Sequence, residues 1–458
     1  MKTRWLLTVL CGASLTVQQA AASQKAAPGW SQKQFLITFW CPPPATDEAL
    51  SRVAAEGFNL TWTPAEGLDA AGRHGLRAML QSDLLNPEVL DNAAKRAELD
   101  ALIGRVKEHP ALEAYYLTDE PGAGAFAALG RLVAYLRERD PAHFAYINLF
   151  PTYANEQQLG VSANAADRAR VGYPQNFAGV GTDDGTVLRY REHLKRFVET
   201  VKPELISYDH YHFLKPDKDG RKVDGGQYFL NLALIRMAAM EAGKPFLNII
   251  QANTIEKSWR LPNAEEMRFL VFTTMAYGGR GISYFTYWGP TNYGGLYQDG
   301  RPSPKLEAVV TLNREMARFG PALMQLESTG VYHSGQLPYG TQAIPTNAPV
   351  QIAGPGDFVN DLCRQFQERR DPLEPLFPVG YLPLQHPSPQ PPSLPGRIVR
   401  VLNRKGFQHR FFSPQVGPVG MGELPNEYPH GRSVRDDVVH VQQQHMPFFL
   451  QHQQMDSK

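Results

Sequence analysis

The stretch Glu113-Ala-Tyr-Tyr-Leu-Thr-Asp-Glu-Pro-Gly-Ala123 decides the fold. Its first half is apolar, aromatic and β-prone, its second half carries the adjacent acids Asp119 and Glu120, and Pro121 ends the strand. The two carboxylates therefore stand where a strand ends and the connection to a helix begins. In a parallel α/β barrel, this point lies on the face where catalytic residues gather.

The same alternation of a short β-prone run and an amphipathic helix is repeated eight times along the chain. The β-prone runs are Gln34–Cys41, Asn59–Thr63, Leu76–Leu80, Leu112–Thr118, His143–Phe150, Glu204–Tyr211, Pro245–Gln251 and Gly281–Trp288. Between them, apolar residues recur at three- and four-residue spacing in Thr46–Gly57, Asp91–Glu108, Gly124–Arg139, Thr186–Val201, Tyr228–Ala242 and Ala264–Tyr277, and Lys305–Gln325 follows the last run. This order predicts an α/β protein with a (β/α)8 TIM barrel.

The chain divides into four parts by composition. Met1 to Ser23 has a basic start, an apolar stretch too short to span a membrane and a small-residue exit, which predicts a signal peptide at 1–23 and a secreted or periplasmic protein. The barrel is expected over 30–326, and a small β appendage over 327–356. Residues 357–458 are rich in Pro, Gln, His and Arg, which predicts a low-complexity or disordered tail.

The composition also limits the classes of ligand. The 46 Lys and Arg residues nearly balance the 45 Asp and Glu residues, so no basic surface for nucleic acid is expected. Cys41 and Cys363, the cysteines outside the leader, make neither a disulfide framework nor a zinc-binding spacing. No glycine-rich phosphate loop occupies a strand-to-helix turn, so no cofactor is predicted.

Asp119 and Glu120 are suited to the hydrolysis of a glycosidic bond. This reaction needs a proton donor for the leaving oxygen and a second group for the developing positive charge. Next to Tyr115 and Tyr116, Glu120 could have the raised pKa that a general acid needs. A structural role remains open, because an acid before Pro121 also favours the start of a helix.

A second carboxylate, Asp209, ends the sixth run and is expected on the same face of the barrel. A capping or ion-paired role remains open for it. Asp209, His210 and His212 also raise the alternative of a metal site, but no third cluster of ligands accompanies them, so the sequence predicts none.

Aromatic and amide side chains at other strand ends are expected to bind substrate. A Trp face suits the C–H surface of a sugar ring, while amides and hydroxyls can bond its hydroxyl groups. The seventh run ends in the amide Gln251 and carries no acid. The predicted substrate-binding residues are Trp40, Asn148, Tyr208, Tyr211, Gln251 and Trp288.

Residues 30–335 resemble the secreted (β/α)8 glycoside hydrolases, through the leader, the acid after strand four and the run from Trp288 to Lys305. In β-galactosidases and cellulases, an acid/base Glu after strand four usually follows an Asn, and a nucleophilic Glu follows strand seven. Here Glu120 matches the first position, Asp119 replaces the Asn, and Gln251 stands near the nucleophile position.

A second resemblance is to chitinases and hexosaminidases, in which the 2-acetamido group of the substrate acts as the nucleophile. Hexosaminidases often carry an adjacent Asp-Glu pair after strand four, as Asp119-Glu120 stand here. Chitinases carry Tyr-Asp after strand six, similar to Tyr208-Asp209, and a Trp after strand eight, similar to Trp288. Their alternating Asp residues on strand four are missing.

The sequence therefore predicts a glycoside hydrolase that acts on an oligo- or polysaccharide. Glu120 is the expected general acid/base, and Asp119 or Asp209 the stabilising partner. The alternative is a non-catalytic carbohydrate-binding protein on a decayed barrel, which the missing strand-seven acid favours.

Overall fold

The computed structural model describes residues 29–161, 178–180, 184–221, 224–254, 258–289, 294–333, 337–343, 398–404 and 407–411. The predicted leader and most of the predicted tail lie outside these residues. In the described part of the chain, no helix combines the length and the apolar character needed to cross a membrane.

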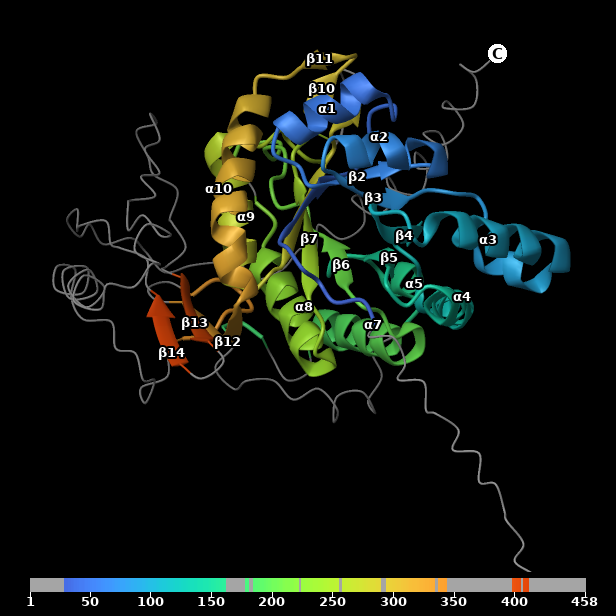
Figure 1. Cartoon of the computed structure of the whole chain (residues 1–458). Helices are drawn as coiled ribbons and strands as arrows, with labels where there is room; N and C mark the ends of the chain where they lie inside the picture. Colours follow the sequence, from blue (N-terminus) through green and yellow to red (C-terminus); the bar gives the residue numbers. More distant parts are fainter. Residues whose placement is uncertain are drawn as a thin grey trace, which may run out of the picture.

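Eight parallel strands form the centre of the molecule (Figure 1). They are β1 (Leu36–Phe39), β2 (Leu60–Thr63), β3 (Arg77–Leu80), β4 (Leu112–Asp119), β5 (Phe144–Leu149), β6 (Ile206–Asp209), β7 (Phe246–Gln251) and β8 (Gly281–Phe285). Their order is β1-β8-β7-β6-β5-β4-β3-β2, so each strand lies beside its neighbour in sequence and β1 also pairs with β8. This is the strand order of a (β/α)8 barrel, as predicted.

Asn59 joins the two ends of this strand order. Its Nδ2 donates a 2.8 Å hydrogen bond to the carbonyl of Phe35, and its Oδ1 accepts one of 2.8 Å from the N–H of Ile37. The backbone N–H of Asn59 in turn donates to the carbonyl of Ile37 at 3.1 Å. A side-chain amide thus supplies hydrogen bonds between β1 and β2 and completes the barrel.

Helices surround the barrel and alternate with the strands (Figure 1). They are α1 (Asp47–Ala55), α2 (Leu68–Arg73), α3 (Ala93–Val106), α4 (Phe126–Arg139), α5 (Glu156–Leu159), α7 (Gly185–Val201), α8 (Tyr228–Ala242), α9 (Ala264–Ala276) and α10 (Leu306–Met324). The predicted helices agree with these bounds to within two residues. Asn263 caps α9 through a reciprocal bond with Glu266, a capping box that fixes where this helix begins.

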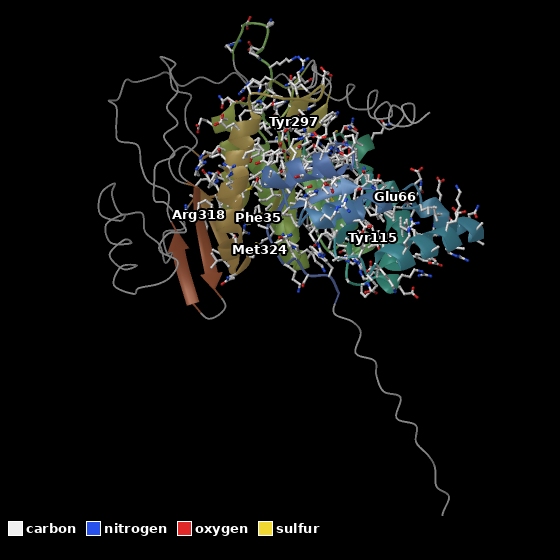
Figure 2. All side chains as sticks on the ribbon, turned by 45° about the horizontal axis from the view of Figure 1, so that its top comes forward. Phe35, Glu66, Tyr115, Tyr297, Arg318 and Met324 are labelled. Carbon is white, nitrogen blue, oxygen red and sulfur yellow. The ribbon has the colours of Figure 1, made fainter. Side chains whose placement is uncertain are left out.

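The strand predictions are confirmed in number and order, but several predicted runs extend past their strands, the eighth by three residues at its end. The run Gly281–Trp288 was expected to be one strand, whereas β8 ends at Phe285. Trp288 belongs to β9 (Trp288–Gly289), which pairs with β10 (Tyr297–Gln298) and, through it, with β11 (Arg301–Pro302). In Figure 2, Tyr297 lies toward the opposite end of the barrel from Phe35 and Met324.

A second small sheet follows α10. Its first strand, β12 (Leu326–His333), pairs antiparallel with β13 (Ile398–Arg404), which pairs with β14 (Phe407–Phe411). Two segments of the predicted tail, residues 398–404 and 407–411, thus form a sheet with a strand that begins at the predicted appendage. The other residues of 357–458 lie outside the described part of the chain.

Candidate active site

Three acids and one amide meet at the carboxyl ends of β4, β5 and β6. Asn148 lies beside Asp119 in the register of β4 and β5, and beside Ser207 in that of β5 and β6. Its Nδ2 donates hydrogen bonds to Oδ1 of Asp119 at 2.9 Å and to Oδ1 of Asp209 at 3.0 Å. Because both bonds start at one nitrogen, the two carboxylate oxygens cannot be farther apart than the sum of these lengths.

The orientation of the Asn148 amide is fixed from below. Its Oδ1 accepts a 3.2 Å hydrogen bond from Oγ of Ser207, and the hydroxyl of Tyr146 lies 2.8 Å from the same Oγ. Asn148, Ser207 and Asp209 are all at most 2% exposed. The amide therefore presents its N–H groups, rather than its oxygen, to the acids.

Glu120 has an unusual backbone conformation directly after β4. Its φ of 44° is in the left-handed region, which is uncommon for a residue other than glycine, and its N–H donates to the carbonyl of Asn148 at 2.9 Å. The residue is half-buried, yet its Oε1 is sealed from solvent and has no hydrogen-bond partner in the described structure. Helix α4 begins only at Phe126, with Ala125 as its N-cap, so Glu120 does not lie in that helix's first turn.

Burial raises the pKa values of all three carboxyl groups, and repulsion from neighbouring carboxylates adds to the shift of Asp209 and Glu120. Burial raises the pKa of Asp119 to about 6, although the bond from Asn148 opposes the shift. Burial and the charge of Asp119 raise the pKa of Asp209 to about 7. The pKa of Glu120 is raised well above its ordinary value by burial, then by the charges of Asp209 and Asp119, and by a hydrogen bond to Asp209. The physical result is a protonated Glu120 beside an ionisable Asp209.

Aromatic rings line the end of the barrel on which these acids stand. Trp40 lies with its ring centroid 4.9 Å from that of Trp62 and 6.4 Å from that of Phe285. Tyr116 lies 4.8 Å from Trp62, and Tyr146 lies 6.3 Å from Tyr116. These five side chains come from β2, β4, β5, β8 and the end of β1. They form the floor beneath the carboxylates, and Trp40 is 8% exposed.

Tyr211 is brought to the acids as well. Its ring lies 5.3 Å from Phe285 and 5.6 Å from Trp259. Burial raises the pKa of Tyr211 well above its usual range, and the charges of Asp209, Glu120 and Asp119 add to the effect. Its hydroxyl is therefore close enough to interact with the whole carboxyl cluster.

Tyr208, also predicted to bind substrate, lies on the face of β6 that points away from the acids. Successive side chains of a strand point to opposite faces, and Ser207 and Asp209 point into the barrel. Tyr208 is fully buried on the other face. Burial raises its pKa well above the usual range, and Tyr228, Tyr190, Asp209 and Tyr277 add to the shift. It packs beneath the helices and does not reach the cluster.

Gln251 ends β7, but its amide is occupied by the backbone. Its Nε2 donates to the carbonyls of Phe213 at 3.1 Å and Arg260 at 2.7 Å, and its Oε1 accepts from the N–H of Phe213 at 2.9 Å. It holds the loop after β6 against the loop after β7. No side-chain hydrogen-bonding group of Gln251 is left for a substrate, apart from the second lone pair of Oε1.

Trp288 lies in the small β9-β10-β11 sheet, and the residue is half-buried. Its N–H donates to the carbonyl of Cys41 at 3.0 Å, and its ring stacks on Tyr297 at 6.0 Å with an angle of 18°. At the carboxyl end of β8, Phe285 packs against Trp40 and Tyr211. The apolar run continues past the strand, so Trp288 lies three residues beyond the end of β8.

The two histidines after Asp209 have other partners. His210 Nδ1 lies 2.9 Å from Oδ1 of Asn231, and His212 Nδ1 lies 3.0 Å from the carbonyl of Gly225. Burial lowers the pKa of His210 to about 3, so it is neutral at physiological pH. Within the described residues, no three His, Cys, Asp or Glu side chains are grouped so that they could hold a metal ion.

Cys41 lies close to the acids without being suited to nucleophilic chemistry. Burial, followed by the charge of Asp119, raises the pKa of its thiol to about 12. The thiolate form is therefore strongly disfavoured at neutral pH.

Several residues of this site were not anticipated. Tyr146, Ser207 and Phe285 belong to it, as does Tyr153, whose hydroxyl accepts a 3.5 Å hydrogen bond from the N–H of Tyr211. Alternation along the strands would have identified Tyr146 from Asn148 and Ser207 from Asp209, since residues two apart share a face. Tyr153 lies in a loop and gave no such signal.

Comparisons with known proteins find similarity in structure alone. No family model matches the sequence, and no curated protein matches it. Among solved structures, the β-galactosidase of Rahnella sp. R3 is 12% identical with a TM-score of 0.40, over 62% of this chain and 56% of that one. Xylanase 10B of Thermotoga maritima is 10% identical with a TM-score of 0.35, over 62% and 96%. With TM-scores this low, the fold assignment rests on the strand order of the barrel itself.

Proposed function

We propose that this protein is a glycoside hydrolase in which Glu120 is the general acid/base. The observation that supports this most is the placement of a carboxyl group with a strongly raised pKa beside two other carboxyls at the mouth of the barrel. Oε1 of Glu120 is buried without a partner, so the group has an unused position to offer a leaving-group oxygen. An aromatic floor of this kind suits the apolar face of a sugar ring.

Two chemical roles have to be filled for the glycosidic bond to break. Glu120, protonated, would donate its proton to the glycosidic oxygen as the bond to the sugar carbon lengthens. Asp209, ionised and held by Asn148, would stabilise the positive charge on the ring, either by activating a water molecule or by orienting the 2-acetamido group of the substrate. Asp119 shares the same amide and can exchange this role with Asp209. Because the Gln251 amide is occupied at the end of β7, these acids are the best candidates for the second group.

The test is the release of nitrophenol from aryl glycosides with and without a 2-acetamido group. Wild type, Glu120→Gln and Asp209→Asn are compared, and Glu56→Gln is the matched control. Glu56 is also a buried glutamate with a raised pKa, but it accepts hydrogen bonds from Tyr287 and Tyr297 instead of facing the cluster. We expect the first two variants to lose activity by about 10²–10⁴-fold and the control to retain it.

The outcomes separate the candidate functions. Turnover limited to acetamido sugars supports substrate assistance, and turnover of plain hexosides supports direct attack by water or a carboxylate. A protein that binds sugars equally well with Gln at position 120 and turns over none of the substrates, polymers included, would be a carbohydrate-binding protein instead. Activity lost on exhaustive chelation would indicate the metal-dependent alternative.

A further inference from the structure

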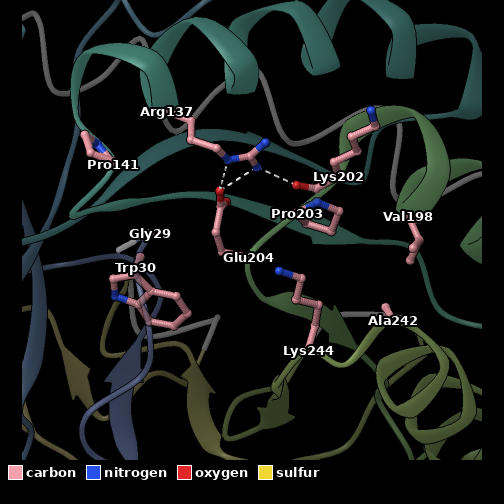
Figure 3. Close-up of a pocket in the computed structure, with 10 residues that line it drawn as sticks. All are labelled: Gly29, Trp30, Arg137, Pro141, Val198, Lys202, Pro203, Glu204, Ala242 and Lys244. Carbon is pink, nitrogen blue, oxygen red and sulfur yellow. Dashed lines mark hydrogen bonds and ion pairs between the residues drawn. The ribbon is translucent and has the colours of Figure 1, made fainter. Parts of the chain in front are cut away.

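A pocket of about 460 Å³ lies at the end of the barrel away from the acids. It is formed where β5, β6 and β7 begin, whereas the acids stand where β4 and β6 end. From Glu204 to Asp209 the chain advances five residues, which corresponds to roughly 16 Å along a strand. The pocket (Figure 3) has an aromatic, a carboxylate and three cationic side chains in its lining: Trp30, Arg137, Lys202, Glu204 and Lys244.

Glu204 offers a fixed hydrogen-bond acceptor. Its Oε1 accepts a 2.5 Å hydrogen bond from Nε of Arg137. Nη2 of Arg137 donates to the carbonyl of Lys202, also at 2.5 Å. The side chain of Glu204 is 11% exposed, and its Oε2 is buried without a partner in the described structure. A buried acceptor without a donor costs free energy, so a ligand hydroxyl that donates to it would be favoured.

Trp30 offers an aromatic face. Its indole Nε1 donates to Oε1 of Glu113 at 2.9 Å, and its ring lies 4.3 Å from that of Phe144. These contacts fix the ring and use its polar edge. The part that lines the pocket is an apolar surface, which suits the C–H face of a pyranose ring.

Lys202 and Lys244 give the pocket an excess of positive charge. Both are exposed, and neither makes an ion pair within the part of the chain that the structure describes. In Figure 3, the amine of Lys244 points toward the space between Trp30 and Glu204. The ends of α7 and α8 bring partial negative charge here, but about half a charge at each helix end does not cancel two lysines.

We propose that this pocket is a second saccharide site that binds an acidic sugar such as a hexuronate. The ring lies on Trp30, a ring hydroxyl donates to Oε2 of Glu204, and the sugar carboxylate pairs with Lys244, while Lys202 adds positive charge at the edge of the pocket. The site does not depend on the activity proposed for the acids. It would anchor an anionic glycan chain on the face remote from the acids.

The test is a titration with D-glucuronate monitored by tryptophan fluorescence, with D-glucose and acetate as comparison ligands. We expect saturable binding of glucuronate, with no comparable change for either comparison ligand. Lys202→Met/Lys244→Met should weaken binding by about tenfold, whereas Lys95→Met, which removes an exposed lysine on α3, should not. Trp30→Phe should remove the fluorescence signal.

Other results would overturn the proposal. Equal binding of glucose would remove the role of the lysines, and equal binding of acetate would reduce the pocket to a simple anion site. Absence of glucuronate binding to the wild-type protein would refute the proposed site. Glu120→Gln must bind glucuronate as wild type does, because a loss in that variant would place the ligand at the acids.

Discussion

Asn148 donates a 3.0 Å hydrogen bond to Asp209, which is 61 residues further along the chain and on the next strand of the barrel. The same amide nitrogen holds Asp119 at 2.9 Å on the preceding strand. Two acids that would repel each other are thus held together by one neutral donor. Burial, together with the charges of these two acids, raises the pKa of the third acid, Glu120, and keeps it protonated.

The pH dependence of turnover is expected to be bell-shaped. Activity rises as Asp209 ionises around its pKa of about 7, and falls at higher pH as Glu120 loses its proton. Asp119→Asn removes a negative charge that raises both pKa values. Both limbs of the profile of kcat/KM should therefore move to lower pH in this variant. A pH profile that does not shift in Asp119→Asn would show that Asp119 does not affect the pKa values of Asp209 and Glu120.

Glu120→Gln should stabilise the fold at high pH. The pKa of Glu120 is raised in the folded state, so its contribution to stability is fully present below the unfolded pKa of about 4.5 and is lost as the pH rises through the folded value. Gln cannot ionise and can still donate to Asp209. Thermal denaturation at several pH values should give equal stability near pH 4. Above pH 4, the difference in free energy of unfolding should grow in favour of Glu120→Gln, by about 1.4 kcal/mol for each unit of pKa shift. A difference in unfolding free energy that does not change with pH would contradict a raised pKa of Glu120.

Tyr208 and Tyr211 provide a matched pair of variants. Tyr211→Phe removes a hydroxyl beside the three acids and should lower kcat/KM by about tenfold. Tyr208→Phe removes a buried hydroxyl that has no hydrogen-bond partner in the described structure, so kcat/KM should stay the same and Tm should not fall. The opposite pattern in steady-state kinetics would assign Tyr208 to the site.

Gln251→Ala should destabilise the protein by about 2–4 kcal/mol, because three backbone groups lose their partner at once. Gln251→Glu should also lower the free energy of unfolding, since a carboxylate would face the carbonyls of Phe213 and Arg260. Chemical denaturation measures both effects. An increase in turnover without loss of stability in Gln251→Glu would show that this position accepts a nucleophile.

The sequence by itself determined the barrel and the place of its acids. Apolar periodicities of two and of about 3.6 residues mark strands and helices locally, and eight alternations leave little choice of topology. Because the carboxyl ends of parallel strands meet on one face, Asp119, Glu120, Asn148 and Asp209 could be assigned to that face before any contact was known.

Tertiary structure alone decided what each side chain does there. Strand register and loops from distant segments decide the direction of Tyr208, the occupation of the Gln251 amide and the position of Trp288 beyond the end of β8. The pairing of β12 with β13, about 70 residues away, has the same origin. Such contacts join residues far apart in the chain, and a local pattern carries no record of which distant group will satisfy a given hydrogen bond.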